Sequence, residues 1–275
     1  MKKLLACSFA LLTALSFNTY ADGVDFSKLS QKDKDEIGKI ASDYLVQNPE
    51  ILMKAYNSLQ AKQQKEQKNK SDKSIETVIS HSKAILEDPD TPFIGPKDAK
   101  FAIVEFFDYN CVYCSKTAPA LKTIIEKNKD VKFIFKEMPI FADSFETSKL
   151  GAQIGIKVFK EKGSEAYLKY HNAIYETKHF EGALTVEDVK KSAESVGVKI
   201  ELKDGEYEDI IAKNMALAAD VSLNGTPAFV FMTASNHTDE NTLVNMGALS
   251  VEQLQNVIDQ LREQTSDKNK NDVKP

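Results

Sequence analysis

The spacing of apolar residues along the chain changes character near residue 100. Before this point, apolar positions recur every three to four residues among Lys, Asp and Gln, which predicts amphipathic helices. The first stripe comprises Ile37, Ile40, Ala41, Tyr44 and Leu45, and the second comprises Ile51, Leu52, Ala55, Tyr56 and Leu59. The stretch "QNPE" separates the two, because Asn48 is suited to cap a new helix and Pro49 to its first position.

A polar run follows the second stripe and predicts either a solvated helical extension or a flexible linker. Apolar spacing resumes at Ile75, and "EDPDTPFIGPKDAK" then marks a boundary with its three prolines. We therefore divide this region into an N-terminal helical segment, residues 22–65, and a helical linker, residues 66–89. Two short amphipathic helices do not bury a core alone. They are expected to pack on the main domain or, by preference, on a second copy of the chain.

Downstream, strands and helices alternate. "FAIVEFF" and "VKFIFKEMP" are typical of buried strands, and "SKTAPALKTIIEKN" between them predicts a helix, which makes a βαβ unit. A long helical stretch over about residues 145–218 follows, with breaks near "KHFEGAL" and "VGVKIELKDGE". Two more strands are predicted in "NGTPAFVFM" and "TLVNMGAL". A closing helix starts at a capping box of Ser250 and Gln253 and runs through Arg262, and residues 263–275 are expected to form a disordered tail.

The first 21 residues have the pattern of a secretory signal peptide. A basic start, "MKK", precedes the uncharged run "LLACSFALLTALSF", and small residues Thr19 and Ala21 place the cleavage site after Ala21. The run is shorter than the roughly 20 residues of a membrane-spanning helix. Cys7 lies too close to the start for lipoprotein processing. We therefore expect an exported, soluble protein located in the periplasm.

Charge and cysteine content exclude several classes of function. The chain has 36 basic and 41 acidic residues, a net charge of −5 at pH 7, and no basic patch with interleaved aromatics, so nucleic acid is not an expected partner. Of its 3 cysteines, Cys7 belongs to the predicted signal peptide, which leaves Cys111 and Cys114. A mature chain with only this pair is not a disulfide-rich scaffold.

The pair Cys111 and Cys114 has three interpretations. Structural zinc needs about four ligands, and no histidine pairs with these cysteines in the sequence. A structural disulfide across so short a loop would stabilise the fold little. The redox interpretation fits best, because the pair follows a strand and opens a helix whose N-terminus favours a thiolate. We expect Cys111 to be the solvent-accessible cysteine of low pKa, and Cys114 to be shielded.

Two further residues support redox chemistry. Glu105 lies within an apolar strand six residues before Cys111, and a buried carboxyl there would have a raised pKa and exchange a proton as the thiol reacts. Its alternative is an exposed acid at a strand end. Pro227, in "NGTP" before a strand, predicts a cis peptide bond, with an ordinary trans proline as the alternative.

"FFDYNCVYC" with the downstream "GTP" and "FVF" resembles the thioredoxin superfamily, specifically the DsbA-like periplasmic thiol:disulfide oxidoreductases, over about residues 90–262. The resemblance implies an α/β protein: a thioredoxin fold with an inserted helical domain, preceded by an N-terminal helical oligomerisation segment. It makes Cys111 the nucleophile and Cys114 the resolving cysteine. It also makes Pro227 a cis-proline against the pair and Glu105 the family's buried acid.

Two positions depart from the best-known DsbA pattern. Val112 and Tyr113 stand between the cysteines where that pattern has Pro-His, and Thr226 precedes the proline where strong oxidases have Val. Both choices resemble the disulfide isomerases of the superfamily. "YLVQNPEIL" is typical of the ScsC-like and Com1-like branch, whose N-terminal segments oligomerise. We therefore expect a homo-oligomer. Symmetry favours a dimer, the commonest closed form, and a trimer comes second because some relatives in this branch form trimers.

The expected function is to form or isomerise disulfides in exported client proteins through the Cys-Val-Tyr-Cys pair, without a cofactor. A membrane redox partner of the DsbB or DsbD type would reset the pair. One alternative is a copper-tolerance protein whose two thiolates hold Cu(I), a soft ion suited to soft ligands. A structural or chaperone role of the oligomer is the other.

Overall fold

The computed structural model describes residues 29–271, without the side chains of 64–73 and of residues beyond 264. The predicted signal peptide, residues 1–21, and the last four residues of the predicted tail lie outside the described residues. The chain divides into two units between Gln63 and Gln64.

In the first unit, α1 (Gln31–Gln47) begins at a capping box, in which Ser30 and Asp33 each bond the other's backbone amide. α2 (Pro49–Ser80) starts at Pro49, as predicted. Asn48 was predicted to cap the start of α2, but it is the C-cap of α1. Its side chain donates to the Tyr44 carbonyl at 2.8 Å. No residue of α1 is buried, so the first apolar stripe is exposed within this unit.

The polar run after the second stripe belongs to α2, which continues through it to Ser80. Of the two predicted alternatives, a helical extension and a flexible linker, the helical extension is confirmed. The last part of α2 and the short α3 (Ser82–Leu86) then join the second unit's core through Val78, Ile85 and Leu86. The segment predicted as a linker therefore ends in residues that stabilise the main domain.

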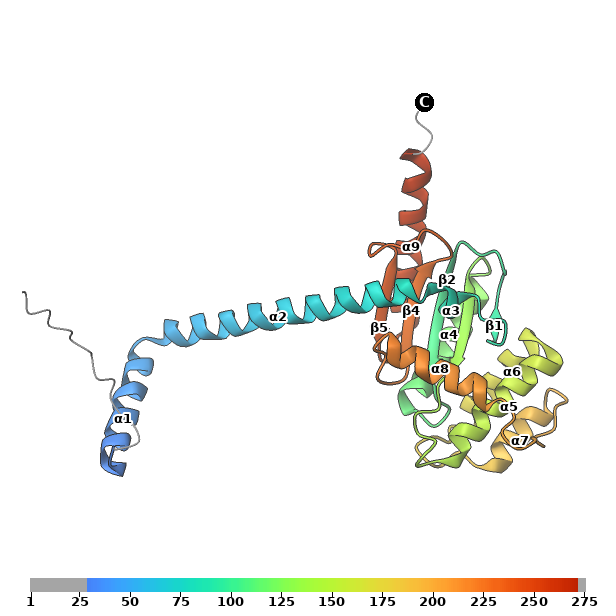
Figure 1. The fold of residues 1–275 in the computed structure, drawn as a ribbon, viewed down its shortest axis with the longest axis horizontal. Helices are drawn as coiled ribbons and strands as arrows, with labels where there is room; N and C mark the ends of the chain where they lie inside the picture. The colour runs from blue at the N-terminus through green and yellow to red at the C-terminus, as the bar shows by residue number, and fades with distance from the viewer. Residues whose placement is uncertain (1–28, 272–275) are drawn as a thin grey trace, which may run out of the picture. The chain divides into compact units, whose positions relative to one another are not determined.

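The second unit is built on a five-stranded sheet in the order β1-β3-β2-β4-β5 (Figure 1). Its strands are β1 (Phe93–Ile94), β2 (Phe101–Phe107), β3 (Lys132–Glu137), β4 (Ala228–Thr233) and β5 (Thr242–Met246). β2 and β3 are parallel and are connected by α4 (Val112–Lys127), while the other pairs are antiparallel. The predicted βαβ unit and thioredoxin fold are confirmed. β1 was not predicted, because it lies in the proline-rich segment.

The helical insertion lies between β3 and β4, as predicted. It contains α5 (Glu146–Lys162), α6 (Ser164–Glu176), α7 (Val186–Glu194) and α8 (Glu208–Asp220). α5, α6 and α7 pack on one another beside the sheet (Figure 1). The sequence predicts the breaks before α7 and α8, but not the one at Gly163, whose φ of +79° separates α5 from α6.

Alternate residues of β2 face two cores. Phe101, Ile103 and Phe107 join the core that contains α4 and α9. Ala102, Val104 and Phe106 join the core that contains Val78 and α3. Lys136 on β3 is fully buried on the second side, where its ammonium donates to Thr91 Oγ1 at 2.7 Å and contacts Asp88 at 3.1 Å. This buried cation ties the segment before β1 to the sheet.

The closing helix α9 (Val251–Asn271) begins at the predicted capping box. Ser250 N donates to Gln253 Oε1 at 2.9 Å, and Gln253 N donates to Ser250 Oγ at 3.2 Å. The helix continues beyond its predicted end at Arg262 into the segment expected to be disordered. Across residues 29–271, no helix has the length and apolarity needed to cross a membrane.

Candidate functional site

The two cysteines lie at the junction between the end of β2 and the start of α4. Cys111 is the N-cap of α4, and its amide donates to the Asp108 carbonyl at 3.0 Å. Cys114 lies one turn into the helix, and the thiols of both residues are free. The predicted position of the pair, after a buried strand and at a helix N-terminus, is confirmed.

The loop before β4 approaches the same point. The bond between Thr226 and Pro227 is cis, as predicted. The Cys111 thiol donates to the Thr226 carbonyl at 3.2 Å, across 115 positions of sequence. The fold therefore brings together Cys111, Cys114, Thr226 and Pro227.

The pKa values of the two cysteines are shifted in opposite directions. A hydrogen bond from the Cys114 thiol is the largest influence on Cys111 and lowers its pKa to about 6. Burial opposes this shift, while the Thr226 hydroxyl and the amides of Tyr113 and Cys114 assist it. Burial raises the pKa of Cys114 well above its ordinary value. Cys111 is therefore the thiolate at neutral pH.

The predicted solvent accessibility of Cys111 is wrong, whereas the predicted shielding of Cys114 is confirmed. Cys111 is 3% exposed and Cys114 is 1% exposed, so both residues are buried. The exposed residue of the motif is Tyr113, which lies under the ammonium of Lys116 at 5.0 Å from the ring centre. The cysteines are distinguished by their pKa values, because hydrogen bonds at the helix N-terminus lower that of Cys111 and burial raises that of Cys114.

Glu105 is buried within β2, as the redox interpretation predicts, and not exposed at a strand end. Burial, with a smaller contribution from a negative Cys111, raises its pKa to about 8. Its Oε2 atom has no hydrogen-bond partner within the described part of the chain. At neutral pH the side chain is therefore a carboxylic acid with a proton to give.

We expect the reduced protein to be alkylated at Cys111 with a rate midpoint near pH 6, while Cys114 stays unmodified. Thr226→Val removes one donor to the thiolate and should raise this midpoint by about one pH unit. Thr226→Ser keeps the hydroxyl and is the matched control. Pulse alkylation with iodoacetamide and peptide mapping across pH 4–9 measures both. An unchanged midpoint in Thr226→Val, or faster labelling of Cys114, would contradict the assignment.

Glu105→Gln should stabilise the reduced protein in a pH-dependent way. The folded-state pKa of Glu105 is raised from 4.5 to about 8, so its contribution to stability is present below pH 4.5 and is lost as the pH rises toward 8. The variant avoids that loss, which amounts to about 3 kcal/mol at pH 7. Urea unfolding at pH 4 and pH 7 tests this. A gain of equal size at both pH values would show that ionisation is not its cause.

Sequence reasoning missed the residues that hold the redox turn. Asn110 is fully buried; its side-chain amide donates to Ser148 Oγ of α5 at 3.0 Å, and its side-chain oxygen accepts from Gly182 N at 3.0 Å. Its own carbonyl accepts from Glu181 N at 2.8 Å. Tyr175 of α6 donates to the Asp108 carbonyl at 3.0 Å. The helical insertion thus fixes the turn that carries Cys111.

A second buried acid, Glu137 at the end of β3, was also missed. Tyr167 and Tyr109 donate to its Oε1 atom at 2.9 and 3.2 Å, and burial raises its pKa well above the ordinary value. Gly155 leaves space for it, since a Cβ there would lie 2.5 Å from the same oxygen. The signal that identified Glu105, an acid within an apolar run, is absent at Glu137, which follows Lys136 at the end of the strand.

The site has the groups needed for thiol exchange: a stabilised thiolate, a second thiol in hydrogen-bond contact and a buried acid. Among the side chains that the structure describes, no three of His, Cys, Asp or Glu are grouped to hold a metal ion.

Comparison with known proteins agrees with this geometry. The thioredoxin family model matches residues 87–260, and the model of the copper resistance protein ScsC N-terminal domain matches residues 33–66. BcfH of Salmonella enterica Typhimurium is 33% identical, with a TM-score of 0.67 over 84% of this chain and 96% of BcfH. Proteus mirabilis ScsC in a transitional conformation is 30% identical, with a TM-score of 0.59 over 86% of this chain and 100% of ScsC.

Curated relatives are more distant. The Na(+)/H(+) antiporter NhaA 3 of Salinispora tropica is 24% identical over 156 residues, which are 54% of this chain. The alignment covers 23% of the antiporter, and that to the NhaA 1 antiporter of Salinispora arenicola covers 24%. The chain thus spans about a quarter of the length of the curated relatives it matches.

Proposed function

The chain belongs to the thioredoxin family, as a DsbA-like member of the ScsC branch, and from this we propose that it is a periplasmic enzyme that forms or isomerises disulfides in exported client proteins. A general role in thiol:disulfide exchange follows from its relatives. The observation that carries the proposal is the meeting of the Cys111 thiol, the Cys114 thiol and the Thr226 carbonyl at the start of α4.

In the oxidising direction, a client thiolate attacks Cys111 Sγ of the protein disulfide and Cys114 leaves. Because the pKa of Cys114 is raised, it departs most easily as a thiol, and neutral Glu105 is the nearby acid that supplies the proton. A second client cysteine then attacks the client sulfur of the mixed disulfide. Cys111 leaves as the thiolate that the helix N-terminus stabilises, with a new disulfide in the client.

In the isomerising direction, the Cys111 thiolate attacks a wrong disulfide of the client, and a different client thiol later displaces it.

The hydroxyl of Thr226 affects the balance between the two directions. It is buried and has no hydrogen-bond partner within the described part of the chain while Cys111 is a thiol, and it donates to Cys111 once this is a thiolate. Stabilising the thiolate favours the reduced form of the pair, which makes the protein oxidising. A membrane redox partner of the DsbB type would maintain an oxidase, and one of the DsbD type would maintain an isomerase.

Measuring the redox potential against glutathione, together with refolding of a reduced and of a scrambled client, tests this proposal. Exchange with glutathione and turnover of either client would support it, and the faster of the two reactions would give the direction. A pair that does not equilibrate with glutathione, or a protein that acts on neither client, would contradict it.

The second candidate is a Cu(I)-binding protein of copper tolerance. The match of residues 33–66 to a domain named for copper resistance favours it, as do two adjacent free thiols. Titration of Cu(I) into the reduced protein against a competing chelator tests it, with Cys114→Ser, which keeps only one of the two thiols, as the control. Loss of binding in the variant and a Kd below that of the chelator would support this candidate.

A further inference from the structure

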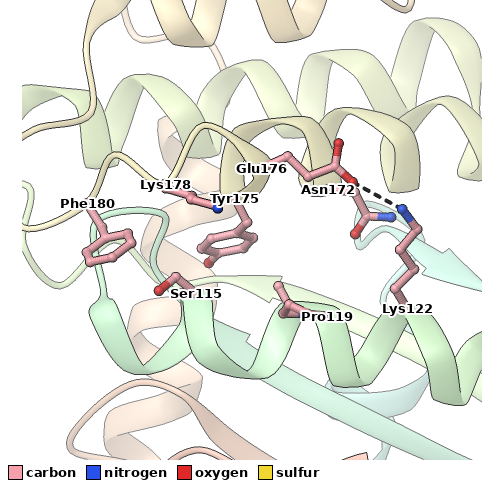
Figure 2. A pocket seen from close by; sticks show the side chains of 9 residues that line it. Ser115, Pro119, Lys122, Asn172, Tyr175, Glu176, Lys178 and Phe180 are labelled. Carbon is pink, nitrogen blue, oxygen red and sulfur yellow. Dashed lines mark hydrogen bonds and ion pairs between the residues drawn. The ribbon is translucent and has the colours of Figure 1, made fainter.

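A pocket of about 370 Å³ lies between α4 and α6, on the insertion side of the redox helix (Figure 2). We propose that this pocket binds the client polypeptide during exchange, an inference that rests on the proposed function. The pocket accepts an apolar client side chain that lies two to five positions from the reacting client cysteine and is followed by an acidic residue.

The floor of the pocket is one face of the helix that carries the cysteines. Ser115, Pro119 and Lys122 contribute to it, at the spacing that places side chains on one face of a helix. Ser115 directly follows Cys114 in the chain, so one end of the pocket adjoins the redox pair. In Figure 2, Ser115 and Phe180 lie at this end, and Lys122 and Glu176 lie at the other.

The opposite wall is held by the same backbone that positions Cys111. The Tyr175 ring points between the two helices (Figure 2), and its hydroxyl donates to the Asp108 carbonyl, which also accepts from the Cys111 amide. The turn after α6 supplies Phe180, and the next residue, Glu181, donates its amide to the Asn110 carbonyl. The pocket is therefore built on the two residues, Asp108 and Asn110, that shape the redox turn.

The residues that line the pocket determine which kind of ligand it can bind. Ala118, Pro119, Tyr175 and Phe180 offer apolar surface, and the charges of Lys122 and Glu176 cancel in an ion pair of 3.1 Å. This leaves the exposed Lys178, whose ammonium makes no ion pair or hydrogen bond with any residue the structure describes. A polar rim with a single uncompensated cation beside an apolar floor fits an apolar group next to a carboxylate.

Size and distance favour an extended client over a folded one. The volume suits one large side chain with its adjoining backbone, at the low end for ligand pockets. Ser115 to Lys122 lie about 6–16 Å along the helix from Cys111 at 1.5 Å per residue. An extended chain covers this distance in roughly two to five residues. A client held to Cys111 as a mixed disulfide therefore reaches the pocket with the residues next to its cysteine.

The test uses three short peptides, each joined through its single cysteine to mercaptoethanol by a disulfide, with the reduced full-length protein. Three residues after the cysteine they carry Phe-Asp, Phe-Asn or Ala-Asn. Cys111 attacks the peptide sulfur, mercaptoethanol leaves as the thiol, and Cys114 then releases the reduced peptide while the pair becomes a disulfide. Each rate constant is divided by that of the same protein with neutral hydroxyethyl disulfide, which has no group for the pocket.

We expect the normalised rate to fall about tenfold from Phe-Asp to Ala-Asn, with Phe-Asn between them. Lys178→Glu should reverse the preference for Asp over Asn, and Phe180→Ala should reduce the preference for Phe over Ala. Lys199→Glu makes the same change of charge on an exposed lysine outside the pocket and should leave all ratios unaltered.

Equal normalised rates for the three peptides, or the same ratios in Lys178→Glu and Lys199→Glu, would overturn the inference and leave the proposed function standing. Absence of reaction with hydroxyethyl disulfide would overturn the proposed function itself, and this inference with it. If a free fatty acid occupies the pocket while the three peptides react at equal normalised rates, the pocket binds a small molecule. This outcome would also overturn the inference.

Discussion

Cys111→Ser should lower the rate of thiol:disulfide exchange by more than about a thousandfold, because a serine hydroxyl is not ionised where Cys111, with a pKa of about 6, is a thiolate. The measurement is insulin reduction and client oxidation by the full-length protein. Circular dichroism of the variant tests whether it folds. Residual activity within tenfold of the wild type would show that Cys114 or another route carries the reaction.

Cys114→Ser is the matched variant of the same chemistry. It retains the nucleophile and loses the resolving thiol, so it should accumulate mixed disulfides between Cys111 and client cysteines. Cys114→Ala, which has no donor, additionally removes the hydrogen bond that is the largest cause of the lowered pKa of Cys111, so in that variant the alkylation midpoint should rise. Non-reducing gels and peptide mapping detect both effects. Failure to trap any client would contradict the assigned roles of the two cysteines.

The local features of the site could be predicted from the sequence because each depends on its own neighbours. "FAIVEFF" is apolar at every position but Glu105, and such a run forms a buried strand whatever it packs against. The cysteines then open a helix because the strand must end and the next apolar spacing is helical. The interaction of Thr226 with Cys111 came from the family resemblance and not from the residues between them.

The remaining features depend on contacts between distant segments. Lys136 would be read as a surface residue, and only the fold shows that Asp88 and Thr91 surround its ammonium. Asn110 meets residues 147, 148 and 182, so its role exists only once the insertion has packed. The burial of Cys111 was missed for the same reason, since the loop of Thr226 lies over it. Local pattern gives the elements, and such long-range contacts complete the site.

Removing the N-terminal segment should convert an oligomer into a monomer. The apolar stripes remain exposed within the first unit, with Ile40 at 69% and Tyr44 at 58%. An apolar hollow on α1 is lined by Ile37, Ile40, Ala41 and Tyr44. Exposed apolar residues at this spacing favour a partner surface, and closed symmetry favours a dimer, with a trimer next. A chain starting at Ser71 should keep its dithiol oxidase activity and lose most of its isomerase activity. We propose that in such an oligomer one subunit would hold a misfolded client while the Cys111 of another attacks it.

Light scattering and activity assays on the mature chain and on the chain from Ser71 measure these effects. Ile40→Glu in the mature chain should also dissociate the oligomer, because it places a charge in the stripe. Ser42→Glu adds the same charge to α1 outside the stripe and should leave the mass unchanged. If light scattering gives the mature chain the mass of a single subunit, the predicted oligomer is wrong and the stripes have another partner. Any isomerisation would then be carried out by the Cys111 of one subunit. If Ile40→Glu dissociates the protein without reducing isomerase activity, the oligomer forms but does not serve catalysis.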